Sequence, residues 1–220
     1  SLLTPELTES IRQDFSSFEK MLYSYDFDNP GAGYEDYIDV ESFIDFFLIN
    51  EFTCNYDAGW LSTYIYKDMT GKFRMCIWDF NSACDNYQDS YIIPNHLEMQ
   101  HCLWYVMLIK DEDFTDRIIK RYKQLRKTYF SEEYLNGYID DCIEYLGDAI
   151  ERNFRVWGYT FKEEHDVLKP AERNARSYDE AVKQLKDFLR IRTEWLDENI
   201  ETVKQYSKES KVKKFIENAN

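Results

Sequence analysis

The sequence predicts an α+β protein that is mainly helical and contains one short antiparallel β-hairpin. Apolar residues recur at helical spacing before residue 53 and again from Met99 onward. Between these regions, residues 62–67 and 72–78 form two runs rich in β-branched and aromatic side chains, separated by a turn at 68–71. With 220 residues, among them 18 Tyr, 15 Phe and 5 Trp, the chain can bury one large core. We therefore expect one domain over residues 1–203, followed by a Lys-rich helix or tail over 204–220.

Two helices are expected before the hairpin. Thr4 can cap the first helix and Pro5 suits its first position. The apolar face of this helix consists of Leu7, Ile11, Phe15, Phe18 and Leu22. A run rich in Gly, Pro and Asn at 28–33 then breaks it. Asp39 can cap the second helix, which ends just before Asn55-Tyr56-Asp57 and gives these residues a rigid base.

After the hairpin, residues 81–95 form a polar loop, and the remaining pattern is mostly helical. Met99–Ile109 is expected to be a buried helix. Asp113 and Ser131 are candidate N-caps of the next two helices, and Ser177 with Glu180 predicts a capping box for a long helix towards Val203. The polar segment 158–176 is expected to link two helices.

Composition excludes some classes of function. The formal net charge is −15, which argues against a nucleic-acid partner, because phosphate binding requires clustered Lys and Arg. The longest uncharged run, Met99–Ile109, is far shorter than the ~20 residues that cross a bilayer, so no membrane span is expected.

The five cysteines and three histidines show no zinc-ligand spacing. Most of the cysteines lie among apolar residues, which favours buried thiols over a disulfide framework. Cys54 and Cys84 flank the acids discussed next, but no His is near either in sequence. His165, with acidic neighbours at 163, 164 and 166, is either a metal ligand or part of a solvated charged loop.

Asp57 and Asp79 stand at the open end of the predicted hairpin and are the main candidates for chemistry. If Lys67 pairs with Lys72, the register places Asp79 opposite Trp60, so the two carboxylates can converge. Two close carboxylates repel each other, and a divalent cation relieves that repulsion. Asp79 also follows an apolar run that is expected to be a buried strand, where an unpaired charge is costly. The alternative is that both residues only form turns and caps.

The order acid, hairpin, acid-Phe is that of protein kinases, and the chain resembles the CotH family of atypical protein kinases. The matching motifs extend over nearly the whole chain, and they are residues 37–51, 55–57, 62–68, 71–72, 78–80, 122–126, 152–153, 157 and 190–197. The resemblance implies the helical carboxy-terminal lobe of a kinase-like fold over residues 1–203. The part that carries the nucleotide-gripping Lys in the family is expected to precede this segment.

The resemblance also implies roles for individual residues. Asp57 would accept the proton of the substrate hydroxyl, and Asp79 with Asn81 would bind Mg or Mn. Asn81 and Asn86 would assist ATP binding. The acceptor would be a Ser/Thr-rich surface or coat protein, and the location extracellular, at the cell surface or in the spore coat. Asn81 replaces the second acid of the family motif, and Ser62 stands where a kinase catalytic loop has Asn.

Two other functions remain open at this stage. Loss of the second acid also suits a non-catalytic scaffold or interaction protein that retains the fold. Asp57 and Asp79 are also a carboxylate pair of the kind that hydrolyses glycosidic bonds. The sequence leaves the oligomeric state, the acceptor and the preferred metal open.

Overall fold

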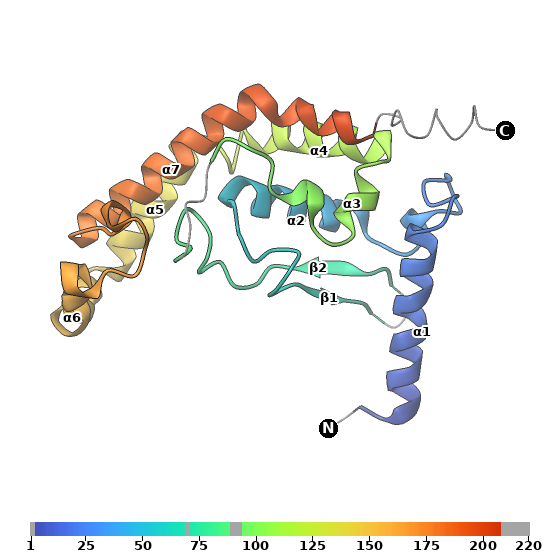
Figure 1. Cartoon of the computed structure of the whole chain (residues 1–220), viewed down its shortest axis with the longest axis horizontal. Coiled ribbons are helices and arrows are strands. Elements are labelled where there is room, and N and C mark those ends of the chain that lie inside the picture. The colour runs from blue at the N-terminus through green and yellow to red at the C-terminus, as the bar shows by residue number, and fades with distance from the viewer. Residues whose placement is uncertain (1–2, 69–70, 89–93, 208–220) are drawn as a thin grey trace.

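The central helix α2 (Val40–Thr53) lies between a β-hairpin on one side and a layer of helices on the other (Figure 1). The computed structural model describes residues 3–68, 71–88 and 94–207. The helices are α1 (Pro5–Leu22), α2 (Val40–Thr53), α3 (Tyr105–Leu108), α4 (Glu112–Leu125), α5 (Glu132–Leu146), α6 (Asp148–Trp157) and α7 (Tyr178–Asn199). The two strands are β1 (Tyr64–Tyr66) and β2 (Arg74–Cys76). This confirms the predicted mainly helical α+β fold with one antiparallel hairpin.

Helix α2 is the centre of the core because it is apolar on nearly every face. Nine of its residues are buried. The hairpin covers one side of the helix, and α4 and α7 cover another (Figure 1). The predicted cap is present, since Asp39 Oδ1 accepts a hydrogen bond of 3.0 Å from Ser42 N. The helix ends where Cys54 takes a left-handed conformation, with φ of 46°.

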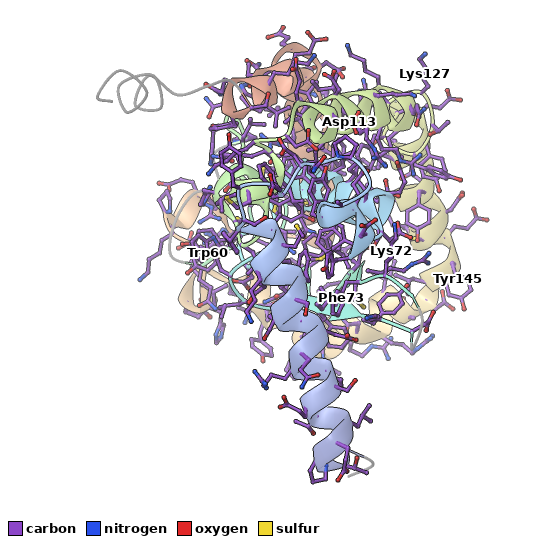
Figure 2. All side chains as sticks on the ribbon, turned by 90° about the vertical axis from the view of Figure 1, so that its right-hand side faces the viewer. Trp60, Lys72, Phe73, Asp113, Lys127 and Tyr145 are labelled. Atoms are coloured by element: carbon purple, nitrogen blue, oxygen red, sulfur yellow. The ribbon has the colours of Figure 1, made fainter. Side chains whose placement is uncertain are left out.

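Helix α1 begins as predicted, because Thr4 Oγ1 accepts from Leu7 N. Its carboxy-terminal half packs on the core, where Phe18 lies 5.3 Å from Trp104 between ring centroids. Its amino-terminal half stands out from the body (Figure 2). Leu7 and Ile11, predicted to lie on a core face, are therefore exposed.

The hairpin register differs by one residue from the predicted one. Tyr64 pairs with Cys76 and Tyr66 with Arg74, so the register places Lys67 opposite Phe73 rather than Lys72. The backbone of Phe73 is bonded to Tyr37 O and Asp39 N, both at 2.8 Å. This docking onto the chain before α2 fixes β2 independently of the turn. The turn residues 69 and 70 lie outside the described residues.

Two further predictions about helices are corrected. Met99–Ile109 is a 3-10 turn (Met99–His101) followed by the short α3, with Leu103 at a left-handed φ of 42° between them. The N-cap of α4 is Asp111, which accepts from Asp113 N, so Asp113 lies inside the first turn. The Asp111 carboxylate already accepts a hydrogen bond from a free backbone N–H group of the first turn.

The other predicted caps are confirmed. Ser131 caps α5 and Ser177 caps α7. The Glu180 carboxylate accepts a hydrogen bond of 2.7 Å from Arg176 N, and not from the backbone N–H of the cap residue Ser177. Helix α7 ends at Asn199 and continues as a 3-10 helix (Ile200–Tyr206). The linker 158–176 contains 3-10 turns at Gly158–Phe161, Glu163–His165 and Ala171–Arg173.

Helices α5 and α6 and the start of α7 form an arm that extends from the core (Figure 1). Neither α5 nor α6 has a fully buried residue. The arm begins where α4 ends and returns through α7, whose second half packs on α2. No helix in the described part of the chain has the length and apolar character required to span a bilayer.

All five cysteines are free thiols. Cys54 and Cys102 are buried and Cys84 is partly buried, as expected from their apolar neighbours. Cys76 on β2 and Cys142 on α5 are exposed, which the sequence context did not indicate. None of the five is paired in a disulfide bond.

Candidate active site

Asp57 lies in a tight loop that continues directly from α2. Its carbonyl oxygen accepts from Trp60 N at 3.2 Å and Leu61 N at 2.8 Å, which closes a turn around the residue. Asn55, two residues earlier, is buried and joins this loop to α2 through Asn50. Asn50 is in turn bonded to Phe46 O. The rigid base predicted for Asp57 is thus a chain of side-chain amides.

Asp79 follows β2 and has a left-handed backbone conformation, with φ of 56°, which residues other than glycine rarely adopt. The prediction that it ends a buried strand is wrong. Trp78 is 60% exposed and Ile77 is 58% exposed, and Asp79 itself is exposed. The reason is that α2 covers only the inner face of the hairpin, through Met75, whereas no described element covers the outer face. Asp79 is therefore accessible to a ligand.

The two acidic segments are joined by reciprocal hydrogen bonds. Ser82 Oγ, three residues after Asp79, donates to Asp57 Oδ2 at 2.9 Å. Ser62 Oγ, five residues after Asp57, donates to Asp79 Oδ2 at 3.1 Å. Asn55 Nδ2 adds a longer bond of 3.4 Å to Asp79 O. Each carboxylate is thus oriented by a serine from the other segment. The corrected register, which places Asp79 opposite Leu61, still brings the segments together.

Backbone strain is concentrated around these residues. Among the described residues other than glycine, Ser62, Asp79, Cys84 and Asp85 have positive φ, as do Cys54 and Leu103. Five of these six lie between positions 54 and 85. Such conformations cost about 1–3 kcal/mol each and gather at functional sites. Gly59 lies in the same region at φ of 80°, and a Cβ there would lie 2.4 Å from Cys102 Cβ.

The site offers oxygen ligands of the kind that Mg²⁺ prefers. Asn55 Oδ1 is buried yet has no hydrogen-bond partner among the described residues, while its amide nitrogen donates to Asn50 and Asp79. These two bonds fix which end of the amide is oxygen. Asp79 and Asn81, two positions apart in the sequence, are both exposed.

No group of three or more His, Cys, Asp or Glu residues in the described part of the chain is gathered to hold a metal by itself. Mg²⁺, however, commonly uses only one or two carboxylates and completes its shell with waters and phosphate oxygens. The residues present therefore fit a cation that arrives with a phosphate ligand better than a cation held by protein alone. Sharing of one cation by Asp57 and Asp79 stays a prediction.

Asn81 and Asn86 lie on one short turn. Asn86 Nδ2 donates to Asn81 O at 2.8 Å, which leaves the Asn86 side chain engaged with the backbone. Both side chains are exposed. The structure therefore brings the two predicted nucleotide-binding asparagines together, with Asn86 acting on the shape of the turn.

An aromatic surface lies beside Asp79 on the outer face of the hairpin. Tyr64 and Trp78 meet edge to face, with centroids 6.0 Å apart. Tyr66 is exposed on the same strand. The three aromatic side chains are open to solvent, and exposed apolar patches of this kind often mark binding sites.

Two buried arginines hold the loop that follows Asp79, one at each end. Arg173 donates to the Asp85 carboxylate, to Asp85 O and to Tyr87 O. Arg192 is fully buried and donates to Pro94 O, His96 O, Glu51 O and the Glu51 carboxylate. The described residues on both sides of 89–93 are therefore fixed to the helical part of the chain.

Glu51 completes the second of these contacts. Its carboxylate also accepts from Glu98 N and Met99 N. Burial raises the pKa of the Glu51 carboxyl, and the Arg192 guanidinium and the two backbone N–H groups oppose that rise. Sequence reasoning missed both arginine contacts, because their partners are 88 and 141 residues away.

The other candidates for chemistry receive no support from the structure. Burial raises the pKa of the Cys84 thiol to about 12 and raises that of Cys54 further, so both are neutral thiols at neutral pH. His165 packs against the Tyr159 ring, and Asp166 beside it is paired with Arg176. The acidic loop is therefore a surface segment.

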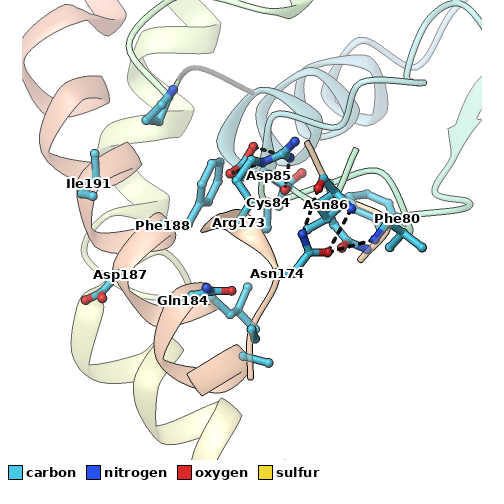
Figure 3. A pocket seen from close by; sticks show the side chains of 18 of the residues that line it. Phe80, Cys84, Asp85, Asn86, Arg173, Asn174, Gln184, Asp187, Phe188 and Ile191 are labelled. Carbon is cyan, nitrogen blue, oxygen red and sulfur yellow. Dashed lines mark hydrogen bonds and ion pairs between the residues drawn. The ribbon is translucent and has the colours of Figure 1, made fainter. Parts of the chain in front are cut away.

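A cavity of about 940 Å³ opens beside the turn that carries Asn86 (Figure 3). One wall is the segment 80–86, and the others come from the linker 160–175 and from α7. Its apolar lining includes Phe80, Phe161, Leu168, Leu185 and Phe188. Sequence reasoning missed this cavity, because its walls come from regions that are far apart in the chain.

Comparison with known proteins identifies one family. The family model described as CotH kinase protein matches residues 3–196. This range includes every predicted site residue. No curated protein matches the chain.

Proposed function

The chain belongs to the CotH kinase protein family, and on that premise we propose that it takes part in transfer of the ATP γ-phosphate to Ser or Thr hydroxyls of an acceptor protein. The observation that carries the proposal is the reciprocal pairing of the Asp57 and Asp79 segments through Ser82 and Ser62. Phosphate transfer depends chiefly on positioning and electrostatic stabilisation. Two oriented carboxylates on one rigid loop pair supply such positioning.

Asp57 is proposed as the residue that orients the acceptor hydroxyl and accepts its proton. Ser82 occupies its Oδ2 atom, so Oδ1 is the oxygen directed to the acceptor. The carbonyl group of Asp57 is held by two backbone N–H groups, which prevents the residue from turning away. A base must lie within hydrogen-bond reach of the proton that it takes.

Asp79, with Asn81, is proposed to hold Mg²⁺ or Mn²⁺, and the turn that Asn86 shapes is proposed to receive the phosphates. When bound, the cation would neutralise charge on the phosphate oxygens. Ser62 keeps the Asp79 carboxylate in one orientation. The adjacent aromatic surface of Tyr64 and Trp78 suits the flat apolar ring of a nucleobase.

The proposed acceptor is a Ser/Thr-rich protein of the cell surface or spore coat, and this location is inferred from the family name. Asn81 in place of an acid leaves the site with one negative charge less than the family motif. We therefore expect weaker metal binding than in a site with two acids, because ligand charge contributes to cation affinity.

The test compares three variants of the complete protein that contains this segment: Asp79→Asn, Asp57→Asn and, as a control, Asp68→Asn, whose side chain is exposed. Asp79→Asn should weaken Mg²⁺-dependent ATP binding, because an anionic ligand is lost. Asp57→Asn should leave ATP binding nearly unchanged and lower phosphate transfer by about 100-fold or more, because an amide cannot accept the proton. Asp68→Asn should match the parent in both assays.

Binding is measured by calorimetry with ATP and Mg²⁺, and transfer by incorporation of labelled phosphate into Ser-rich peptides. Equal behaviour of Asp79→Asn and Asp57→Asn would contradict the assigned roles. A parent protein that binds no nucleotide with either metal would favour the alternative, a scaffold that retains the fold without turnover.

A further inference from the structure

The cavity between the segment 80–86, the linker 160–175 and α7 shares its wall with the candidate active site (Figure 3). Phe80 follows Asp79 directly, and Asn86 lies on the turn assigned to phosphate binding. A polypeptide that presents a hydroxyl to Asp57 therefore passes close to this cavity.

The lining is apolar and its polar groups are mostly engaged with the protein itself. Thr53 and Thr160 donate their hydroxyl groups to backbone carbonyls, at 2.8 Å in both cases. Asn174 is bonded to the backbone of residues 167, 168 and 171. Arg173 is committed to Asp85 and Tyr87. The cavity therefore offers an apolar surface to a ligand and few groups that are free to form hydrogen bonds with it.

The cavity volume of about 940 Å³ lies at the upper end of the range of about 300–1,000 Å³ for ligand sites. This is more than one side chain fills, and the cavity is open to solvent. A peptide segment with one or two large apolar side chains matches both its size and its chemistry.

We propose that this cavity is the specificity site for the acceptor polypeptide, and that it takes a large apolar side chain located a few residues from the Ser or Thr that is modified. The inference rests on the proposed function. It adds a substrate requirement that the two aspartates alone do not impose.

The walls are held in place by contacts already described. Arg173 joins the linker wall to the segment 85–87, and the N-cap of α7 at Ser177 fixes the start of the helical wall. The cavity is therefore preformed, which lowers the entropic penalty of binding.

Two variants fill the cavity from two of its walls: Ala181→Phe on α7 and Val167→Phe on the linker. Both residues line the cavity and neither is fully buried, so a larger side chain has space to enter it. The matched control is Ala171→Phe, which is exposed on the linker and does not line the cavity. Circular dichroism confirms that each variant is folded.

The probes are labelled Ser-containing peptides in which Phe, Ala or Asp occupies each position around the Ser in turn. Anisotropy measures binding, and phosphate incorporation is measured in parallel. The parent should bind peptides with Phe at one position about tenfold or more tightly than those with Asp, as expected for burial of one large side chain. Ala181→Phe and Val167→Phe should abolish this preference, and Ala171→Phe should retain it.

The two proposals fail in different ways. Phosphate transfer without any positional preference overturns the specificity site and leaves the kinase activity standing. Peptide preference without phosphate transfer overturns the activity and leaves the site. A preference that persists in both folded filling variants, or binding of no peptide at all, also overturns the specificity site.

Discussion

Ser62 and Asp79, 17 residues apart, are joined by a hydrogen bond of 3.1 Å from the Ser62 hydroxyl to Asp79 Oδ2. Both residues have left-handed backbone conformations, with φ of 46° and 56°. The bond therefore connects two strained positions, one after Asp57 and one at the end of the hairpin. Because Asn tolerates the left-handed region better than most residues, the residue type at position 62 affects both the backbone and the carboxylate.

Ser62→Asn should be tolerated and Ser62→Ala should not. The Asn amide can still donate to Asp79, and it suits the left-handed φ. Ala loses the hydrogen bond and should lower the free energy of unfolding by about 0.5–1.5 kcal/mol. Urea denaturation of both variants measures this difference. An equal loss in the two variants would show that the Asn amide does not replace the hydroxyl contact, and an unchanged Ser62→Ala would show that the contact contributes no stability.

Gly59 is the glycine whose replacement should damage the site loop most directly. A Cβ at this position would lie 2.4 Å from Cys102 Cβ, at a φ of 80° that L residues rarely adopt. Gly59→Ala should therefore destabilise the protein by about 1–3 kcal/mol, through strain and crowding. The measurement is the midpoint of thermal unfolding.

Gly137 in α5 provides the matched control, since a Cβ there meets nothing within 4 Å. Gly137→Ala should stabilise the helix by about 0.5–1 kcal/mol, because Ala is the better helix former. A loss of stability in this control, similar to that of Gly59→Ala, would contradict the role assigned to the contact with Cys102.

Arg192→Met should be among the most destabilising substitutions in α7. It leaves the Glu51 carboxylate buried without its cation, and breaking a buried pair costs about 3–5 kcal/mol. Arg190→Met is the control, because Arg190 is exposed and is paired with Glu194 one turn away. Its effect should stay below about 0.5 kcal/mol.

The double variant Glu51→Gln/Arg192→Met separates pair loss from simple loss of packing. A neutral amide can still accept from Met99 N, and it removes the uncompensated charge. The double variant should be less destabilised than the sum of the two single variants, by at least about 0.5 kcal/mol. Strict additivity in denaturant unfolding would exclude coupling between the two side chains.

Asp197 should contribute to loss of stability in acid. Burial raises the pKa of its carboxyl, but hydrogen bonds from Arg126 and Tyr122 lower it more, so that the pKa lies below its ordinary value. The unfolded chain then binds the proton at a higher pH than the folded protein does. The stabilisation is therefore complete above the ordinary Asp pKa of about 4 and is lost as the pH falls through the lower folded value.

Asp197→Asn should flatten the fall of unfolding free energy below about pH 4. The measurement is urea denaturation at a series of pH values, with Asp68→Asn as an exposed control. An unchanged slope in Asp197→Asn would show that other carboxyl groups cause the acid sensitivity.

Local features of the fold were predictable because the information for them is local. Thr4, Asp39, Ser131 and Ser177 cap helices with side chains that reach only a few residues along the chain. The positions of Asp57 and Asp79 beside the hairpin likewise predicted that their segments meet, and Ser62 and Ser82 join these segments.

Long-range features were not predictable from one sequence. The register moved by one residue because Phe73 is fixed by Tyr37 and Asp39, and not by the turn alone. Asp79 proved exposed because periodicity cannot tell which face of a two-stranded hairpin is covered. The cavity and the contacts of Arg173 and Arg192 form where distant segments of the chain pack together. The polar composition of the linker does not indicate which segments these are.

The distribution of thiols has a practical consequence for spectroscopy. Cys76 and Cys142 are exposed, whereas Cys54, Cys84 and Cys102 are at least partly buried and have raised pKa values. Thiol-reactive dyes should therefore label one site on the hairpin and one on α5, without any introduced cysteine. Energy transfer between these dyes would follow the separation of the arm and the hairpin as ATP or a peptide is added.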